Sequence, residues 1–109
     1  MIINIITNSP FNEVDKDNLL SIREIEVTEF SNKGLWEENT LITQILVTSI
    51  SSISLNVLSS ILYDIIKNYQ AKLNLNKKTI SYSSKISKNE IIELIRKEIE
   101  EGNNNVDNT

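Results

Sequence analysis

The chain has 109 residues, a formal net charge of −4, and neither cysteine nor histidine. A chain of this length forms one modest hydrophobic core that buries roughly 60–70% of its unfolded surface. Without cysteine or histidine there can be no disulfide, no thiolate or imidazole zinc site, no thiol nucleophile and no histidine general base. The composition therefore predicts one domain over residues 1–101, followed by a disordered tail over 102–109 that has little to bury.

The N-terminal segment predicts a strand over residues 1–7. It is rich in isoleucine and ends at the turn signal Asn8-Ser9-Pro10. The near absence of polar residues before this turn favours a strand buried on both faces. The following residues, 11–18, are polar and are predicted to form a loop.

A second strand is predicted over residues 22–30, where apolar and polar residues alternate. This alternation is typical of a half-buried antiparallel strand. Glu24 and Glu26 share its polar side and Glu29 lies nearby, so the three carboxylates are a candidate acidic interface. A solvated sheet face protected by charge explains the same pattern.

The run from Leu41 to Ile66 contains one charged residue, Asp64. Its length and low charge are compatible with a membrane-spanning helix. When residues are placed at about 100° per step, however, serines and threonines oppose an arc of isoleucines, which favours helices on a soluble core. Weak helix formers over 48–54 predict an interruption. We expect helices over about 36–48 and 53–70, or one bent helix.

Some apolar residues of this region lie outside the main isoleucine arc: Leu41, Val47, Leu55 and Leu62. If the helices leave these positions uncovered, they are a candidate interface for a homodimer, because exposed apolar patches favour association. Trp36, the single tryptophan, is a candidate for a core anchor or an interface residue.

The C-terminal third predicts a hairpin and a helix. Leucine, isoleucine and tyrosine alternate with polar residues over 71–75 and 79–84, on either side of a turn. Ser87 and Glu90 have the spacing of a capping box, which predicts a helix over 88–101 that ends before Gly102. The predicted fold is thus α+β, with a small antiparallel sheet packed by two central helices and a C-terminal helix.

Catalytic chemistry has no clear basis in the sequence. Two glycines exclude the phosphate-binding and dinucleotide motifs, and the acidic residues Glu13, Asp15 and Asp17 lack the glycine and final glutamate of a calcium loop. We therefore expect no enzyme activity, no cofactor and no metal. The negative charge also disfavours direct binding of nucleic acid, which requires clustered lysine and arginine.

The order of predicted elements resembles the effector-associated constant component domains of bacterial conflict systems. The resemblance covers about Leu35 to Glu100, in the segments LWEENTLITQILVTSISSISLNVLSSILYDIIK and KLNLNKKTISYSSKISKNEIIELI. It is a resemblance of pattern, since members carry glycines at the interruption, where this chain has serines. It implies a small non-enzymatic module that couples peptidases or other effectors, without catalytic residues.

Three functions are compatible with these features. The first is a cytoplasmic interaction module or adaptor in bacterial immunity, whose partner is an effector, a peptidase or a defence complex. The second is a phage-encoded inhibitor of a bacterial defence complex that presents acidic side chains. The third is a small membrane-associated protein. The excess of asparagine, lysine and isoleucine indicates an AT-rich genome, that of a bacterium or its phage.

Overall fold

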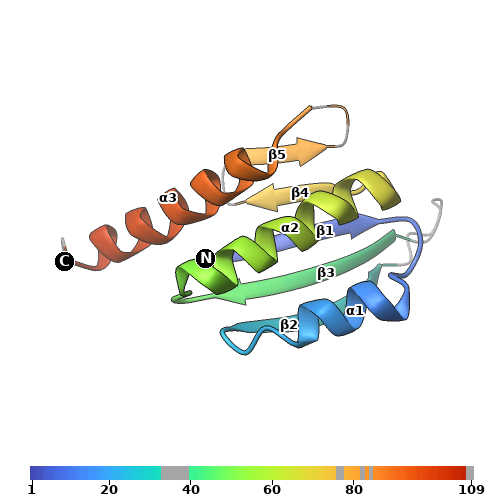
Figure 1. Ribbon diagram of the computed structural model, residues 1–109, viewed down its shortest axis with the longest axis horizontal. Helices are drawn as coiled ribbons and strands as arrows, with labels where there is room; N and C mark the ends of the chain where they lie inside the picture. The colour runs from blue at the N-terminus through green and yellow to red at the C-terminus, as the bar shows by residue number, and fades with distance from the viewer. Residues whose placement is uncertain (33–39, 76–77, 82, 84, 108–109) are drawn as a thin grey trace.

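The structure is a computed structural model that describes residues 1–32, 40–75, 78–81, 83 and 85–107. Its elements in chain order are β1 (Ile2–Thr7), α1 (Glu13–Leu20), β2 (Ile25–Asn32), β3 (Thr40–Val47), α2 (Ser52–Tyr69), β4 (Lys72–Leu75), β5 (Lys78–Ser81) and α3 (Lys88–Asp107). Five strands form one antiparallel sheet in the order β2-β3-β1-β4-β5, and the helices lie on one side of it (Figure 1). The α+β class is as predicted.

The core lies between this sheet and the helices. The strand residues that are buried in the described part of the chain all occupy one face: Ile3, Ile5, Thr7, Ile25, Thr43, Ile45, Val47, Leu73, Leu75 and Ile80. Helix α2 crosses this face at its centre, with α1 on one flank and α3 on the other. Because α2 contacts both other helices, it forms the middle of the covering layer.

The predicted helix over 36–48 is wrong where the structure describes it, because Thr40–Val47 is strand β3. Five of its eight residues are β-branched, which favours a strand. It also pairs along its length with β1 on one side and β2 on the other, so its backbone groups are satisfied by the sheet. In the strand, Ile45 lies on the opposite face from Ile42 and Leu46, so apolar residues of this segment occupy both faces.

The prediction that strand 1–7 is buried on both faces is also wrong. Ile3 and Ile5 are fully buried, whereas Ile2 is 41% exposed and Ile6 is half-buried. A sheet needs a layer on each side to be buried on both faces, and the described helices all lie on one side.

Residues 13–20, predicted as part of a loop, form helix α1. Asn12 begins it, since its side chain accepts a hydrogen bond from the Asp15 backbone N–H at 2.8 Å. Leu19 is the one buried residue of α1, so a hydrophobic stripe could not have revealed the helix. Tyr69 fixes α1 to the end of α2: its hydroxyl donates to the Asp15 carboxylate and accepts from the Asn12 N–H, both at 2.8 Å.

The remaining elements overlap their predicted ranges, although β2 covers Ile25–Asn32 rather than 22–30. Helix α2 begins at Ser52, after an interruption at the predicted place, and β4 and β5 form the predicted hairpin. The capping box is present: the Ser87 hydroxyl accepts from the Glu90 N–H at 3.2 Å, and the Glu90 carboxylate accepts from the Ser87 N–H at 3.4 Å. Helix α3, however, continues past Gly102 to Asp107.

The predicted end of α3 at residue 101 is therefore wrong. Glycine after a helical pattern is a preference for ending a helix rather than an obligatory stop. Inside a helix it costs about 1 kcal/mol relative to alanine.

Candidate functional site

The face of the sheet opposite the helices is not covered by the described residues, and we call it the open face. Its described residues are Ile2, Asn4, Ile6, Glu26, Thr28, Thr40, Ile42, Gln44, Leu46, Lys72, Asn74, Thr79 and Ser81. Each of them is half-buried or exposed. The alternation of side chains along each strand places them together on this side.

The two middle strands of the open face carry two apolar pairs. On strands β1 and β3, Ile2 lies beside Leu46 and Ile6 lies beside Ile42. Ile2 is 41% exposed and Leu46 is 36% exposed. Large aliphatic residues thus occupy positions where a solvated sheet usually carries polar ones.

Polar residues cross the middle of the open face and surround the apolar pairs. The amides of Asn4 and Gln44 are neighbours on β1 and β3, and Asn74 continues the row on β4. The Asn74 side chain accepts a hydrogen bond from the Thr79 hydroxyl at 2.8 Å. Apolar contacts within a polar surround are the usual anatomy of a protein interface.

The predicted acidic interface is dispersed by the fold. Glu24 is engaged with the start of α2, where its carboxylate accepts from the Ser51 N–H (2.5 Å) and from the hydroxyls of Ser51 (3.0 Å) and Ser54 (2.9 Å). The backbone hydrogen bond from Ser51, followed by those from the Ser54 and Ser51 hydroxyls, holds the pKa of the Glu24 carboxyl below its usual 4.5. Glu24 therefore has a structural role as a cap.

The other two carboxylates lie on opposite faces of β2. Glu26 lies on the open face, beside Leu46. Glu29 lies on the helix side and forms an ion pair with Lys16 of α1, with 3.5 Å between Nζ and Oε1. Glu24, Glu26 and Glu29 do not form one acidic surface.

The apolar positions predicted to be uncovered are mostly inside the core. Val47 and Leu62 are 0% exposed and Leu55 is also buried, because β3 is a strand and α2 turns these leucines toward the sheet. A homodimer through these three residues is excluded by their burial. Leu41 is half-buried at the end of β3. Trp36 lies outside the described residues.

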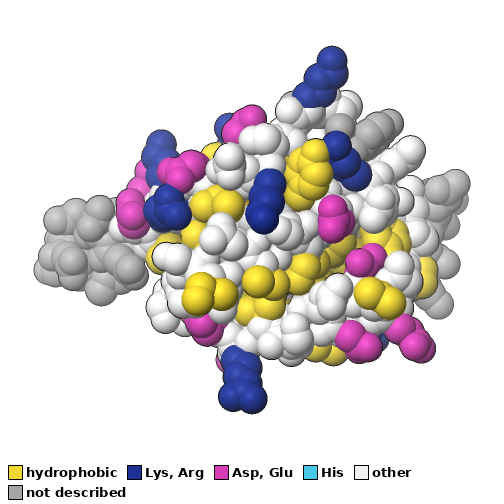
Figure 2. Space-filling model, viewed as in Figure 1, with side chains coloured by type: hydrophobic (Ala, Val, Ile, Leu, Met, Phe, Trp, Pro, Cys, Tyr) yellow, Lys and Arg dark blue, Asp and Glu magenta, His cyan; other side chains and the backbone are white. Residues whose placement is uncertain are grey.

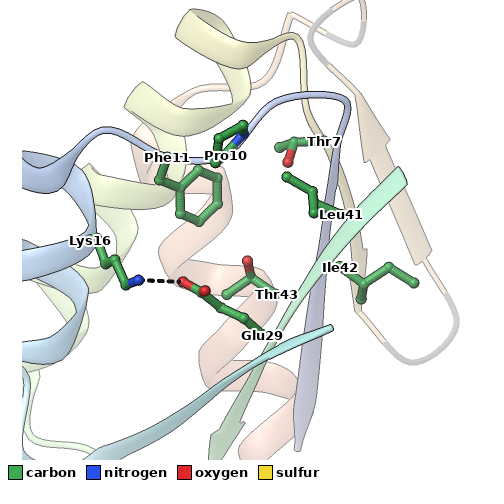
Figure 3. Close-up of a pocket in the computed structure, with 8 residues that line it drawn as sticks. All are labelled: Thr7, Pro10, Phe11, Lys16, Glu29, Leu41, Ile42 and Thr43. Carbon is green, nitrogen blue, oxygen red and sulfur yellow. Dashed lines mark ion pairs between the residues drawn. The ribbon is translucent and has the colours of Figure 1, made fainter. Parts of the chain in front are cut away.

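A cavity of about 290 Å³ lies at the end of the sheet where α1 begins (Figure 3). Its walls are formed by Thr7, Pro10, Phe11, Lys16, Glu29, Leu41, Ile42 and Thr43. Figure 3 shows Lys16 and Glu29 pointing toward each other on one side of it. The Thr7 hydroxyl donates to the Ser9 carbonyl at 2.9 Å. Several polar groups of the cavity are thus already paired within the protein.

The helix side has exposed apolar residues of its own. Figure 2 shows a band of apolar side chains along α1 and α2, interspersed with charged and polar ones. The most exposed large apolar residues of these two helices are Val14 and Leu20 of α1 and Ile53 and Val57 of α2. Ile53 is 79% exposed, in the first turn of α2. These residues provide matched positions against which the open face can be tested.

Sequence reasoning missed the open face because β3 was interpreted as a helix. The signal was present in Ile42, Gln44 and Leu46, which occupy alternate positions in a β-branched segment. The same segment read at a period of two gives a strand with apolar residues on both sides.

Two further features bear on the chemistry. Within the described ranges, no three acidic side chains are grouped closely enough to hold a metal ion. None of the helices described is both long and apolar enough to span a bilayer.

Comparisons with protein-family models, with curated proteins and with solved structures find no match to this chain.

Proposed function

We propose that this protein is a non-enzymatic protein–protein interaction module that binds its partner through the open face. The observation that carries the proposal is the presence of two apolar pairs on the middle strands of that face, Ile2 with Leu46 and Ile6 with Ile42, on either side of the polar row. Apolar side chains that are exposed among polar ones are typical of a binding surface.

The charge of the open face favours a protein partner over nucleic acid. Lys72 is the one basic side chain among its described residues, and Glu26 lies on the same face. Binding to a phosphate backbone depends on several lysines or arginines, each of which releases counterions. The net charge of −4 opposes such binding further.

The proposal includes a cytoplasmic location and a partner from a bacterial defence system, which is an effector, a peptidase or a defence complex. The resemblance to effector-associated constant component domains supports this context through the hairpin and the capped final helix. It draws no support from residues 40–47, which that resemblance assigned to a long helical stretch.

The alternative of a phage-encoded inhibitor required a joint acidic surface, and the separate positions of Glu24, Glu26 and Glu29 give it less support. The alternative of a membrane-associated protein required one long segment over 41–66. That run is divided between β3 and α2.

The test is quantitative capture of partners from the native bacterium with three immobilised baits: the wild type, Leu46→Glu and Ile53→Glu. Leu46 lies on the open face, and Ile53 is an exposed apolar residue on the helix side. Introducing a charge into a desolvated apolar contact is strongly unfavourable. We expect the same partner with wild type and Ile53→Glu, and at least about tenfold less with Leu46→Glu.

Equal far-ultraviolet circular dichroism and equal melting temperatures for the three baits provide the control for folding. Recovery of one partner at equal yield by all three baits would contradict the assignment of the open face. Co-expression with the products of neighbouring genes provides the second measurement, since an adjacent effector or peptidase gene is expected.

A further inference from the structure

We infer that the partner of the open face is a second copy of this chain, stacked sheet against sheet about a two-fold axis that runs between β1 and β3. This inference rests on the proposed function, because it concerns the same surface. It assigns that surface to a second copy of the chain, so an effector, a peptidase or a defence complex would contact another part of the dimer. Its evidence is that the open face is complementary to itself.

Self-complementarity follows from the register of β1 and β3. The cross-strand neighbours are Ile2 with Leu46, Asn4 with Gln44, and Ile6 with Ile42. Each pair joins two side chains of the same chemical type. The two-fold axis lies midway between the two stacked sheets, parallel to the strands and over the line between β1 and β3. It places β1 of one copy over β3 of the other. Aliphatic side chains then contact aliphatic side chains, and amides face amides.

The central amides favour this arrangement over stacking with a shifted register. Asn4 and Gln44 each carry a donor group and an acceptor group, so two copies can satisfy each other across the axis. A shift along the strands by one pair would place an amide over an isoleucine, where its hydrogen-bonding groups would be buried without partners. The polar row therefore fixes the register of the two sheets.

The charges of the open face are compatible with the same axis. Glu26 is on β2, outside β3, and Lys72 is on β4, outside β1. The rotation places β2 of one copy over β4 of the other, but Glu26 lies in the row of Ile2 and Lys72 in the row of Ile6, four residues apart along the strands, so the two charges do not pair across the interface. The same rotation separates each charged side chain from the identical side chain of the other copy, so like charges do not meet.

The size of the face is sufficient for a specific contact. The axis superposes four strands, β2, β3, β1 and β4, and with six residues in β1 the stacked area extends over about 20 Å in each direction. Two such faces, stacked about 10 Å apart, bury on the order of 1,000 Å² in total, which is near the lower limit for specific interfaces. We therefore expect a reversible dimer.

Sedimentation equilibrium of the purified full chain, from about 10 μM to about 1 mM, covers the range where an interface of this size associates. We expect a monomer–dimer equilibrium for the wild type and for Ile53→Glu. Leu46→Glu places a carboxylate over Ile2 of the other copy and should weaken association at least about tenfold. A monomeric wild type at the highest concentration, or equal association of both variants, would overturn the inference.

A chemical cross-link tests the position of the axis independently. The chain has no cysteine, so Asn4→Cys and Asn56→Cys each introduce one thiol. Asn4 lies next to the axis, and Asn56 lies exposed on α2. With stacked sheets about 10 Å apart, a bismaleimide of similar length should link Asn4→Cys into a covalent dimer. Asn56→Cys should remain monomeric, and equal yields for both variants would exclude this axis.

The two proposals fail in different ways. If the wild type is monomeric while Leu46→Glu loses a different captured protein, the open face is an interface and the second-copy inference alone is wrong. If Leu46→Glu changes neither the dimer nor the captured proteins, the open face is not the interface and both are wrong.

Discussion

The two faces of β1 and β3 carry the same kinds of residue but differ in how deeply these residues are buried. On the helix side, Ile3, Ile5 and Ile45 are 0% exposed; on the open face, Ile2 and Leu46 keep more than a third of their surface in contact with solvent. The difference does not lie in hydrophobicity, since isoleucine occupies both faces. It lies in the position of the helices, which supply one layer for a sheet that has two apolar sides.

The layer is fastened to the sheet at both ends of α2. At its start, Glu24 accepts hydrogen bonds from Ser51 and Ser54. At its end, Gln70 adopts a left-handed conformation, with φ of 50°, which turns the chain directly into β4. The covered face is therefore covered by a helix whose two ends are fixed.

The largest expected effect is on the covered face. Leu62 of α2 is fully buried in the core. Leu62→Ala removes apolar contacts and leaves a cavity, which should lower the free energy of unfolding by about 3 kcal/mol. Urea denaturation followed by circular dichroism measures this change in the free energy of unfolding. A loss no larger than that of an exposed leucine would mean that α2 does not form the core described here.

A smaller effect of opposite sign is expected at Ser59. Ser59 is a residue of α2 whose side chain is fully buried, and its hydroxyl has no hydrogen-bond partner within the described structure. Ser59→Ala removes a buried polar group and introduces a better helix former, so we expect the free energy of unfolding to rise by about 1 kcal/mol. Ser60→Ala, one position along the helix and less buried, is the control and should change stability less.

The cap at the start of α2 predicts a dependence on pH. The pKa of Glu24 is lower in the folded protein than its ordinary 4.5, so its stabilisation is fully present above about pH 4.5 and is lost as the pH falls through the folded pKa. Glu24→Gln should melt below the wild type at neutral pH, and the two melting temperatures should converge in acid. A difference that stays constant down to pH 3 would contradict this role.

The smallest effect is expected on the open face. Leu46→Thr keeps a strand-forming residue at a partly exposed position, so the free energy of unfolding should change by about 0.5 kcal/mol or less at protein concentrations where the monomer prevails. At high concentration the same change should weaken association. A loss as large as that of Leu62→Ala in dilute solution would show that the open face is covered within the monomer.

Several elements could be predicted from the sequence because their signals are local. The capping box of Ser87 and Glu90, the hairpin of β4 and β5 and the alternation in β2 depend on residues within a few positions of each other. Helix α2 was predicted within one residue at each end, since its apolar arc matches a helical period over many turns. The predicted polar side of β2 was confirmed at Glu26 and Thr28, both exposed.

The candidate site could not be predicted in the same way. Thr40–Val47 fits a helix and a strand almost equally, and the choice depends on β1 and β2, which supply its backbone hydrogen bonds from distant parts of the chain. Once that element was assigned to a helix, Val47 appeared available for contact and Leu46 did not. For α1 the available signal was the N-cap residue Asn12. It precedes a segment that has no apolar stripe to indicate a helix.

The sequence by itself determined the α+β class, one core, the two longer helices and the lack of cysteine and histidine chemistry, because composition and local periodicity fix these properties. Only the tertiary structure decided which side of each apolar strand is covered. Burial depends on where the helices pack, and a chain that forms one helical layer leaves the second apolar side of its central strands exposed.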